Sequence, residues 1–365
     1  MKFSAPREAI LKPLQAVIGV VERRQTMPIL SNVLLVAREG VLSVTATDLE
    51  VELVAEGKIE AGSSGETTVP GRKLHDIMRA LPEGAKVDVA LSGDRLTVKA
   101  GRSRFTLSTL GAGDFPTIED IAAKQTLEVP AAALQKLLQR THFSMAQQDV
   151  RYYLNGLLLE TDGKKLRGVA TDGHRLALAE VELEKPTTRA EQVIVPRKGV
   201  LELNRLLTGD GGVQLTLGAS HLRAQFDGLR LTSKLIDGRF PEYGRVIPKD
   251  PPNVLIADRG LLRQALQRAA ILSNEKYRGV RLQLGNNSVV IQANNPEQEE
   301  AVETVELEYS GEDLEIGFNV NYLLDALSAV DGEQVSLGVT DADSSCLITQ
   351  PGHEDAKFVV MPMRL

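Results

Sequence analysis

The feature that most constrains the fold of this chain is an internal repeat with a period of about 124 residues. The segment "SNVLLVA" at 31–37 is followed by the similar segments "LNGLLLE" at 154–160 and "RGVRLQL" at 278–284. In the same way, "VPGRKLHDIMRALPEGAKVDVAL" at 69–91 aligns with "VPRKGVLELNRLLTGDGGVQLTL" at 195–217. A repeat of this length is long enough to form a domain, so we expect several domains of like fold.

Three domains are predicted, and their boundaries are 1–122, 123–249 and 250–365. The natural linkers are "TIEDIAAKQ" at 117–125 and the proline-rich "PKDPPN" at 248–253, since such segments interrupt helices and strands. A chain of 365 residues is also long enough for three separate hydrophobic cores.

Each predicted domain divides again into two halves. A short extended segment leads into a run with apolar residues at helical spacing, and then into alternating segments typical of antiparallel strands. The helical runs are 6–18, 71–81, 130–143, 197–207, 258–270 and 319–330. Leu262, Ala265 and Leu266 should face the core, and Pro13 should bend or break the first helix. The pattern predicts an α+β fold of six βαβββ-like units, each with one helix on antiparallel sheet.

The composition is that of a folded, water-exposed protein, with 42% hydrophobic and 25% charged residues. Cys346 is the one cysteine, which excludes an internal disulfide and a multi-cysteine zinc site and is typical of the reducing cytoplasm. The histidines are scattered, so we expect neither a metal site nor a cofactor. No apolar run approaches the roughly 20 residues that cross a bilayer, and charged residues near the N-terminus argue against a signal peptide.

The segment "ATDGHRLA" at 170–177 has the residue types of an acid–base centre. The first repeat, however, has "ATDLEVEL" at 46–53, so the Thr-Asp pair belongs to the scaffold and should cap a turn. An enzyme that uses Asp172 and His174 is a weak alternative, because no nucleophile-bearing pattern accompanies them. His174 and Arg175 are better interpreted as polar surface, either at a binding site or simply solvated.

Five of the six predicted helices carry net positive charge, although the whole chain has a net charge of −7. If the repeats surround an axis, these helices form one positive surface that could follow a duplex by its phosphates, without reading bases. The alternative is that these are ordinary solvated faces on a repeat scaffold that binds only proteins. The basic residues away from the apolar stripes are Arg72, Lys73, Arg79, Lys136, Arg140, Arg197, Lys198, Arg205, Arg259, Arg263 and Arg268.

Longer segments, spread in order over the whole chain, carry a family resemblance. They include "LKPLQ" (11–15), "GRSRF" (101–105), "FSMAQQDVRYYLNG" (143–156), "ATDGHRLA", "VPRKGV" (195–200), "DGRFP" (237–241), "AILSNEK" (270–276), "ANNPEQEE" (293–300) and "VVMPMRL" (359–365). These segments resemble the bacterial DNA polymerase III beta subunit, the sliding-clamp family. The resemblance implies a non-enzymatic processivity factor with no cofactor. It further implies three like domains and a head-to-tail homodimer that closes a six-domain ring around duplex DNA.

The resemblance also implies partners and sites. The partners are the polymerase III alpha subunit, the clamp loader, other DNA polymerases and repair proteins, each bound through a short apolar peptide. The implied peptide groove is Leu154, Thr171, Gly173, His174, Arg175, Leu176, Pro241, Arg245, Val246, Val359, Met361, Pro362, Met363 and Arg364. The implied loop contacts to duplex DNA are Arg24, Gln148, Tyr152 and Tyr153. The implied dimer contact joins Phe105 and Leu107 of one copy to Ile271 and Leu272 of the other.

Overall fold

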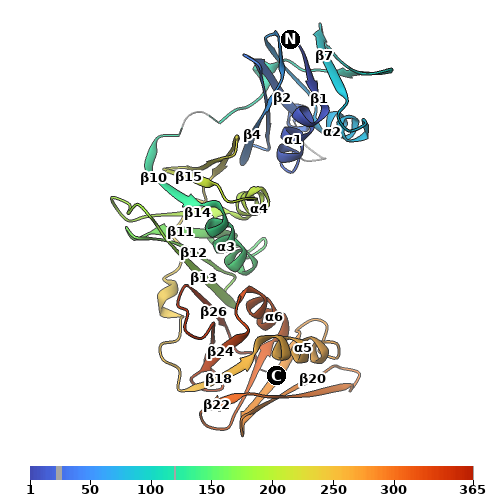
Figure 1. Cartoon of the computed structure of the whole chain (residues 1–365). Coiled ribbons are helices and arrows are strands. Elements are labelled where there is room, and N and C mark those ends of the chain that lie inside the picture. The colour runs from blue at the N-terminus through green and yellow to red at the C-terminus, as the bar shows by residue number, and fades with distance from the viewer. Residues whose placement is uncertain (22–26, 119–120, 365) are drawn as a thin grey trace. The chain divides into compact units, whose positions relative to one another are not determined.

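The computed structural model describes residues 1–21, 27–118 and 121–364 (Figure 1). The described chain forms two compact units, and each is considered by itself. The first unit consists of Met1–Ala132 and Lys198–Leu235. The second unit consists of Ala133–Arg197 and Ile236–Leu365. Among the helices of the described residues, none has the length and apolar character needed to span a membrane.

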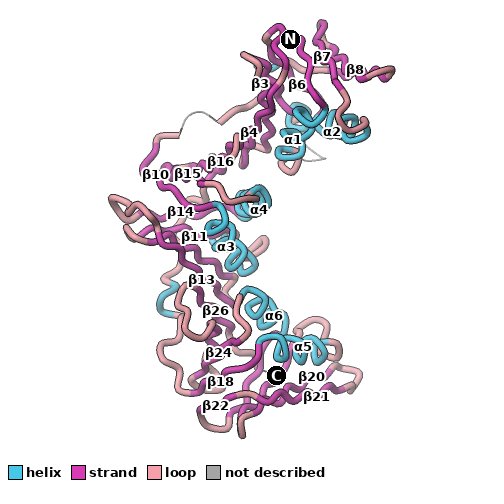
Figure 2. The backbone as a smooth tube through the Cα atoms, viewed as in Figure 1, coloured by secondary structure: helices cyan, strands magenta, loops and turns pink. Residues whose placement is uncertain are grey.

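The described residues contain six α-helices, close to the six predicted runs. They are α1 (Arg7–Val17), α2 (Gly71–Ala80), α3 (Ala131–Thr141), α4 (Arg197–Leu206), α5 (Arg259–Ala270) and α6 (Val320–Ala329). Leu262, Ala265 and Leu266 of α5 are buried, as their spacing predicts. Helices α1 and α2 lie side by side, and so do α5 and α6 (Figure 2).

Each helix follows one strand and precedes three strands that form a meander, so the predicted βαβββ units are confirmed. The strands of the first unit are β1 (Lys2–Pro6), β2 (Asn32–Arg38), β3 (Val41–Thr47), β4 (Val51–Lys58), β5 (Glu60–Ser63), β6 (Gly65–Pro70), β7 (Lys86–Ser92), β8 (Arg95–Ala100), β9 (Ser103–Ser108), β10 (Ala123–Pro130), β15 (Gly212–Gly218), β16 (His221–Phe226) and β17 (Leu229–Lys234). Those of the second unit are β11 (Gly156–Thr161), β12 (Lys165–Thr171), β13 (Arg175–Glu182), β14 (Glu191–Pro196), β18 (Asn253–Asp258), β19 (Gly279–Gly285), β20 (Ser288–Asn294), β21 (Glu300–Glu306), β22 (Glu308–Ser310), β23 (Leu314–Asn319), β24 (Gln334–Val339), β25 (Cys346–Thr349) and β26 (Ala356–Val360).

The two halves of each predicted domain exchange their first strands. Strand β1 joins the meander β7-β8-β9 of the following half, while β6 joins the meander of β2, β3 and β4. The same exchange places β10 beside β15, β14 beside β11, β18 beside β24 and β23 beside β19. Because each half completes the sheet of the other, neither half of a predicted domain has a complete sheet by itself.

Two sheets continue across the predicted domain boundaries. In the first unit, β4 pairs antiparallel with β17, with Leu53 opposite Leu231. In the second unit, β13 pairs antiparallel with β26, with Ala177 opposite Phe358. We call these pairings the first and the second junction. They explain why the compact units do not coincide with the three predicted domains, whose boundaries stay a prediction.

Two equivalent arginines connect neighbouring helices at their ends. Arg7, the first residue of α1, donates to the carbonyls of Met78 (2.7 Å) and Arg79 (3.1 Å) near the C-terminus of α2. Arg259, the first residue of α5, donates to the carbonyls of Leu327 (3.3 Å) and Gly332 (2.7 Å) near the end of α6. A cation is favourable there because the last carbonyls of a helix have no partner within the helix.

Of the two outcomes expected at Pro13, a bend or a break, the break does not occur, since α1 continues from Arg7 to Val17 with Pro13 inside it. A proline has no N–H to donate to the carbonyl four residues earlier, which here belongs to Ala9. Gly57 of β4 packs directly against that carbonyl, because a Cβ on Gly57 would lie 2.0 Å from the Ala9 oxygen. Because Gly57 has no side chain, strand β4 can lie close against α1 beside the proline.

We therefore predict that Gly57→Ala lowers the free energy of unfolding by about 3 kcal/mol, at the upper end for one added methyl group in a packed site. The added Cβ would meet the Ala9 carbonyl and Pro13, so α1 would have to move away from β4. Urea denaturation measures the change. Gly113→Ala is the matched control, because a Cβ at Gly113 meets no atom within 4 Å. Equal stability of the two variants would contradict this account of α1.

Candidate functional site

The segment "TDGHR" forms a tight turn at the start of β13. Asp172 accepts hydrogen bonds from the backbone N–H groups of His174 (2.9 Å) and Arg175 (3.0 Å). In the first repeat, Asp48 accepts from the N–H groups of Glu50 (2.9 Å) and Val51 (2.7 Å) in the same way. The prediction that this acid caps a turn of the scaffold is confirmed.

The two side chains after this turn have different surroundings. His174 is exposed, and its carbonyl accepts the N–H of Met361 (2.9 Å). Arg175 instead reaches the second helix of the C-terminal repeat, where it donates to Asp325 (2.5 Å) and lies 4.5 Å from the ring centroid of Tyr322. Asp172 holds this guanidinium as well (3.1 Å). These contacts give the acid and the arginine structural roles.

A cavity of about 190 Å³ lies beside this turn at the second junction, and we call it the groove. Its floor is apolar, because Leu154, Leu176 and Val359 are almost fully buried there. Leu176 of β13 and Val359 of β26 are opposite each other in the sheet. Nine predicted groove residues line the cavity: Leu154, Thr171, Gly173, Arg175, Leu176, Pro241, Val246, Val359 and Met361.

Five predicted groove residues do not line this cavity. His174 and Arg245 are exposed, and Arg245 forms an ion pair with Glu242 (2.6 Å) instead. Pro362, Met363 and Arg364 lie beyond Met361, where the N–H of Met363 donates to the carbonyl of Gly317 (2.8 Å) and Arg364 lies 3.8 Å from Asp343. The C-terminal residues are thus docked on the second unit, as expected, but they extend past the cavity.

Three lining residues are missing from the prediction, namely Arg151, Glu242 and Tyr243. Arg151 lies over Gly173, because a Cβ on Gly173 would be 3.1 Å from its guanidinium. This guanidinium donates two hydrogen bonds to the carboxylate of Asp149 (3.0 and 2.9 Å), which hold it in place. The side-chain hydrogen bonds from Arg151 lower the pKa of Asp149 to about 2. Glu242 and Tyr243 lie in the sequence between the predicted groove residues Pro241 and Arg245, and this position could have identified them. Arg151 lies next to Tyr152, which was predicted to contact DNA.

The first junction lacks an apolar floor at the equivalent position. Glu52 is opposite Thr232 there, where the second junction has Leu176 opposite Val359. Glu52 is only 1% exposed, and it accepts the backbone N–H of Ile118 (2.8 Å). Burial raises the pKa of this carboxyl above its usual range. Of the two junctions, the second is therefore the one suited to apolar side chains.

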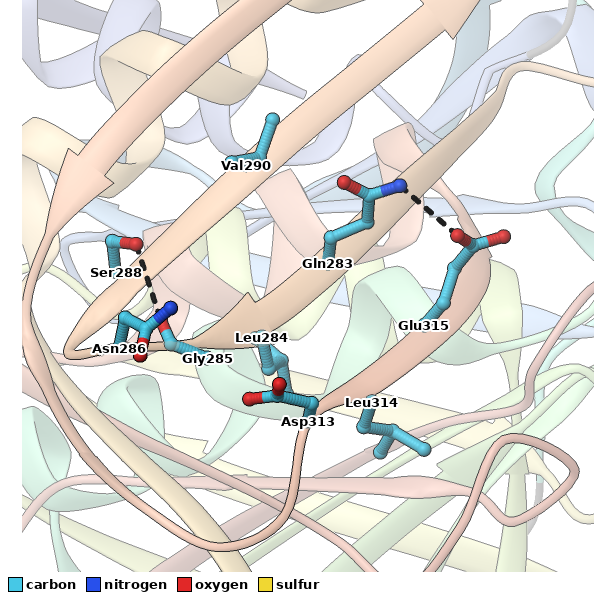
Figure 3. Close-up of a pocket in the computed structure, with 9 residues that line it drawn as sticks. All are labelled: Gln283, Leu284, Gly285, Asn286, Ser288, Val290, Asp313, Leu314 and Glu315. Carbon is cyan, nitrogen blue, oxygen red and sulfur yellow. Dashed lines mark hydrogen bonds between the residues drawn. The ribbon is translucent and has the colours of Figure 1, made fainter.

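A further hollow lies at the turn between β19 and β20 (Figure 3). Its lining mixes polar and apolar groups, with a hydrogen bond from Gln283 to Glu315 (3.0 Å) and another from Ser288 to the carbonyl of Gly285 (3.1 Å). It contains no residue predicted for a site, and among the described residues no cluster of His, Cys, Asp or Glu could hold a metal ion. The groove is the better candidate site for a partner.

The surroundings of Arg140 argue against the predicted contact with DNA, which stays untested. Arg140 is 6% exposed, and its two terminal nitrogens bind Asp355 (2.5 Å) and Asp331 (2.8 Å). A phosphate would have to displace both carboxylates from a buried guanidinium. Lys136, which is half exposed, also binds Asp331 (2.5 Å). Arg140 thus connects α3 to the C-terminal repeat within the second unit.

Several other predicted DNA residues have partners inside the chain. Arg72 donates to the carbonyl of Val21 (2.5 Å), Arg205 to that of Ala16 (2.6 Å), and Arg197 to that of Met145 (3.4 Å). Lys198 forms an ion pair with Asp48. These side chains are all partly or fully exposed, so a second contact with phosphate is still open to them.

The predicted loop contacts with DNA differ in exposure. Gln148 and Tyr152 are exposed, whereas Tyr153 packs against the apolar cluster under the groove. Arg24 lies outside the described residues.

The residues predicted for the dimer contact are at the surface of their own units. Ile271 follows the last residue of α5 and is 75% exposed, which is high for an isoleucine, and Leu272 beside it is half-buried. Phe105 and Leu107 are half-buried on β9, an edge strand of its sheet. Exposure of large apolar side chains at such positions is typical of a protein–protein contact.

The structural role of Arg140 generates a prediction. Arg140→Ala should lower the free energy of unfolding by about 2 kcal/mol, less than for a fully buried ion pair, because both carboxylates are half exposed. The change should appear in urea denaturation. Arg263→Ala is the control, since Arg263 is exposed on α5 and should leave stability unchanged. A stable Arg140→Ala variant with weaker DNA binding would restore the original assignment.

Comparison with known proteins gives matches to one protein family along the whole chain. Family models for the N-terminal, central and C-terminal domains of the DNA polymerase III beta subunit match residues 1–119, 128–242 and 244–364. The beta sliding clamps of Pseudomonas aeruginosa and Escherichia coli K12 are 56% and 52% identical over 367 residues, and all of each chain is covered.

Solved structures agree as well. A crystal structure of the DNA polymerase III subunit beta from P. aeruginosa has a TM-score of 0.97 at 55% identity, with 100% of both chains covered. The beta sliding clamp of Caulobacter crescentus has a TM-score of 0.96 at 43% identity and covers 100% of this chain and 99% of its own. The chain therefore belongs to the DNA polymerase III beta subunit family, the beta sliding clamps.

Proposed function

We propose that two copies of this chain close head to tail into a ring around duplex DNA. The ring, located in the cytoplasm, tethers the replicative polymerase and other partners through the groove. The partners are the DNA polymerase III alpha subunit, the clamp loader, other DNA polymerases and repair proteins. The clamp family is non-enzymatic, so the work of the molecule is confinement and tethering.

The observation that carries this proposal is the pairing at the two junctions. In each junction, the last strand of one meander pairs with the last strand of another, β4 with β17 and β13 with β26. The remaining last strands, β9 and β21, are edge strands within the described chain. An unpaired edge is a ready template for another chain. Pairing β9 of one copy with β21 of the next would repeat the junction and close a ring of two copies.

The charges on the two edges favour this head-to-tail arrangement. Strand β9 carries Arg104, and β21 carries Glu300 and Glu306, all of them exposed. Two copies of the same edge would place like charges opposite each other, which is destabilising, whereas unlike edges would bring opposite charges together. Phe105 and Leu107 lie on β9, and the exposed Ile271 directly follows α5, a helix that packs on β21, so these side chains would add apolar surface to the contact.

The helices supply modest attraction for DNA. Lys12, Lys73, Arg79 and Arg263 are exposed cations on α1, α2 and α5. Phosphate contacts of this kind are independent of sequence and weaken steeply with salt, so they suit sliding better than gripping. A closed ring needs no tight grip, because the duplex cannot leave it sideways. Contacts through Arg24, Gln148, Tyr152, Lys136, Arg197 and Lys198 stay predictions.

The groove suits a short apolar peptide. A cavity with a buried leucine and valine floor can take one or two apolar side chains, while Arg151 and Glu242 at its edge can bind polar groups. Met361, which is exposed at one end, is an adaptable contact of the kind found in sites with many partners. We expect affinities of about micromolar, near −8 kcal/mol, since partners must exchange.

One observation favours a second candidate, a repeat scaffold that binds only proteins. Arg72, Arg140 and Arg205 all have internal partners, so part of the positive charge on the helices has a structural use. The first experiment below tests the dimer that both candidates can share. The second distinguishes them.

We predict that the double variant Ile271→Ala, Leu272→Ala weakens the dimer at least about 30-fold, since loss of two central apolar side chains costs about 2 kcal/mol or more. Sedimentation velocity should show a monomer at concentrations where the unmodified chain is dimeric. Leu261→Ala is the matched control, because Leu261 is an exposed apolar residue on the adjoining helix α5, away from the assigned contact. A dimer of unchanged strength in the double variant would contradict the assigned contact.

We also predict that the clamp, once loaded, stays on circular duplex DNA in high salt and leaves when the circle is cut. Topological linkage survives screening, whereas phosphate contacts do not. Gel filtration of protein on nicked plasmid, before and after linearisation, measures retention. A protein-only scaffold would be retained on neither form, and a gripping DNA binder would be indifferent to cutting.

A further inference from the structure

One wall of the groove consists of a single short segment. Pro241, Glu242, Tyr243 and Val246 line the cavity and belong to the segment after β17 that contains the 3-10 helix η5 (Tyr243–Arg245). The backbone hydrogen bonds of this turn are local, from the N–H of Tyr243 to the Pro241 carbonyl (2.8 Å) and from that of Val246 to the Tyr243 carbonyl (3.1 Å). No ladder of a sheet holds the wall, so its position depends on side chains.

Apolar contacts hold the wall down without fixing its position along the sheet. Phe240 is buried in the cluster that includes Leu158 and Val169, and Tyr243 and Ile247 pack against the same cluster. Hydrophobic contact is non-directional and roughly proportional to the area removed from water. It therefore favours contact with the sheet, but it distinguishes poorly between positions that bury similar areas.

A directional tie comes from the hydroxyl group of Tyr243. This hydroxyl donates to Glu160 of β11 and accepts from Arg167 of β12 (3.2 Å). Within the described residues, it makes the side-chain hydrogen bonds that join segment 237–250 to the sheet. Burial and the hydrogen bond to Glu160 raise the pKa of Tyr243 to about 12, so the hydroxyl stays protonated, and remains a donor, throughout the neutral range.

The two groups that form hydrogen bonds with this hydroxyl, Glu160 and Arg167, are themselves held in place by other side chains. Glu160, Arg167 and Glu180 are directly opposite one another on the adjacent strands β11, β12 and β13. Arg167 donates to Glu160 (2.5 Å) and to Glu180 (2.6 Å), and Lys165 donates to Glu180 (2.8 Å). Charge-assisted bonds of this kind are stronger and more directional than neutral ones. The network thus gives the wall a rigid point of attachment.

We propose that Tyr243 is a positioning residue. Through Glu160 and Arg167 it sets the distance between wall and floor, and with it the size of the apolar side chain that the groove accepts. This inference rests on the proposed peptide-binding function. Its chemistry is steric selection: a wall fixed by a hydrogen bond discriminates between apolar side chains of different size, and a wall held by apolar contact alone adapts to them.

The central variant is Tyr243→Phe, which removes the hydroxyl and keeps the ring against the groove. Tyr309→Phe is the matched control, because the Tyr309 hydroxyl also donates a hydrogen bond, to the carbonyl of Glu312, and Tyr309 lies in the same unit but not at the groove. Both variants are tested as full-length protein, and urea denaturation of each corrects for any general loss of stability.

The first measurement needs no ligand. Hydrogen exchange of the amides of Arg245 and Val246 should become up to about tenfold faster in Tyr243→Phe, the amount that corresponds to one net hydrogen bond. Tyr309→Phe should leave these amides unchanged. Equal protection of the wall in both variants and in the unmodified chain would overturn the proposal.

The second measurement uses two short synthetic peptides that differ only in their bulky apolar side chain, leucine in one and phenylalanine in the other. We expect Tyr243→Phe to bind the preferred peptide about threefold to tenfold more weakly and to bring the two dissociation constants closer together. A general loss of stability would not change the ratio between the peptides. An unchanged ratio would overturn the selection role, whereas failure of the unmodified clamp to bind either peptide would overturn the proposed function and leave the exchange result standing.

A third variant tests the path through Glu160. Glu160→Gln keeps an acceptor oxygen and should preserve most of the selectivity, while Glu160→Ala should reproduce Tyr243→Phe. Because the two groups act as one unit, the double variant Tyr243→Phe, Glu160→Ala should be no weaker than either single variant. Additive losses would show that the two residues act separately, and the proposed coupling would then be wrong.

Discussion

Antiparallel pairing between the last strands of two meanders, which lie three units apart in the chain, is the interaction on which the rest of this structure depends. Each βαβββ unit is incomplete alone, since its first strand completes the sheet of its neighbour and its last strand needs a further partner. Backbone groups at a sheet edge must be paired or hydrated, so the last strand of each meander is available to pair with the last strand of another. The groove forms where one such junction meets the segment after β17, and the proposed ring is the continuation of the same rule into a second chain.

Much of the architecture could be predicted because it is written in short-range patterns. The helical runs, their buried faces and the acid-capped turns at Asp48 and Asp172 all follow from local spacing and local hydrogen bonds. The repeat then extended each local prediction to equivalent positions. The nine groove residues that line one cavity were predicted from the family resemblance, and the fold brings them together at the second junction.

The misses share a different cause, which is pairing between residues far apart in the chain. Arg140 reads as a solvated cation because its two carboxylates lie 191 and 215 residues away. Pro13 is interpreted as a helix breaker because Gly57, which packs against the Ala9 carbonyl, belongs to another element. The exchange of first strands between halves has the same character. A sequence shows which groups need partners, but not which distant groups supply them.

The buried carboxyl of Glu52 at the first junction has a consequence for the binding of partners. The carboxyl of Glu52, almost inaccessible to water and bonded to the N–H of Ile118, takes the place of an apolar floor, so this position lacks the surface that Leu176 and Val359 offer to apolar ligands. Of the two junctions, only the second therefore offers an apolar floor in the described residues. On the proposed function, partners that bind through the groove would therefore compete for the same site on each chain.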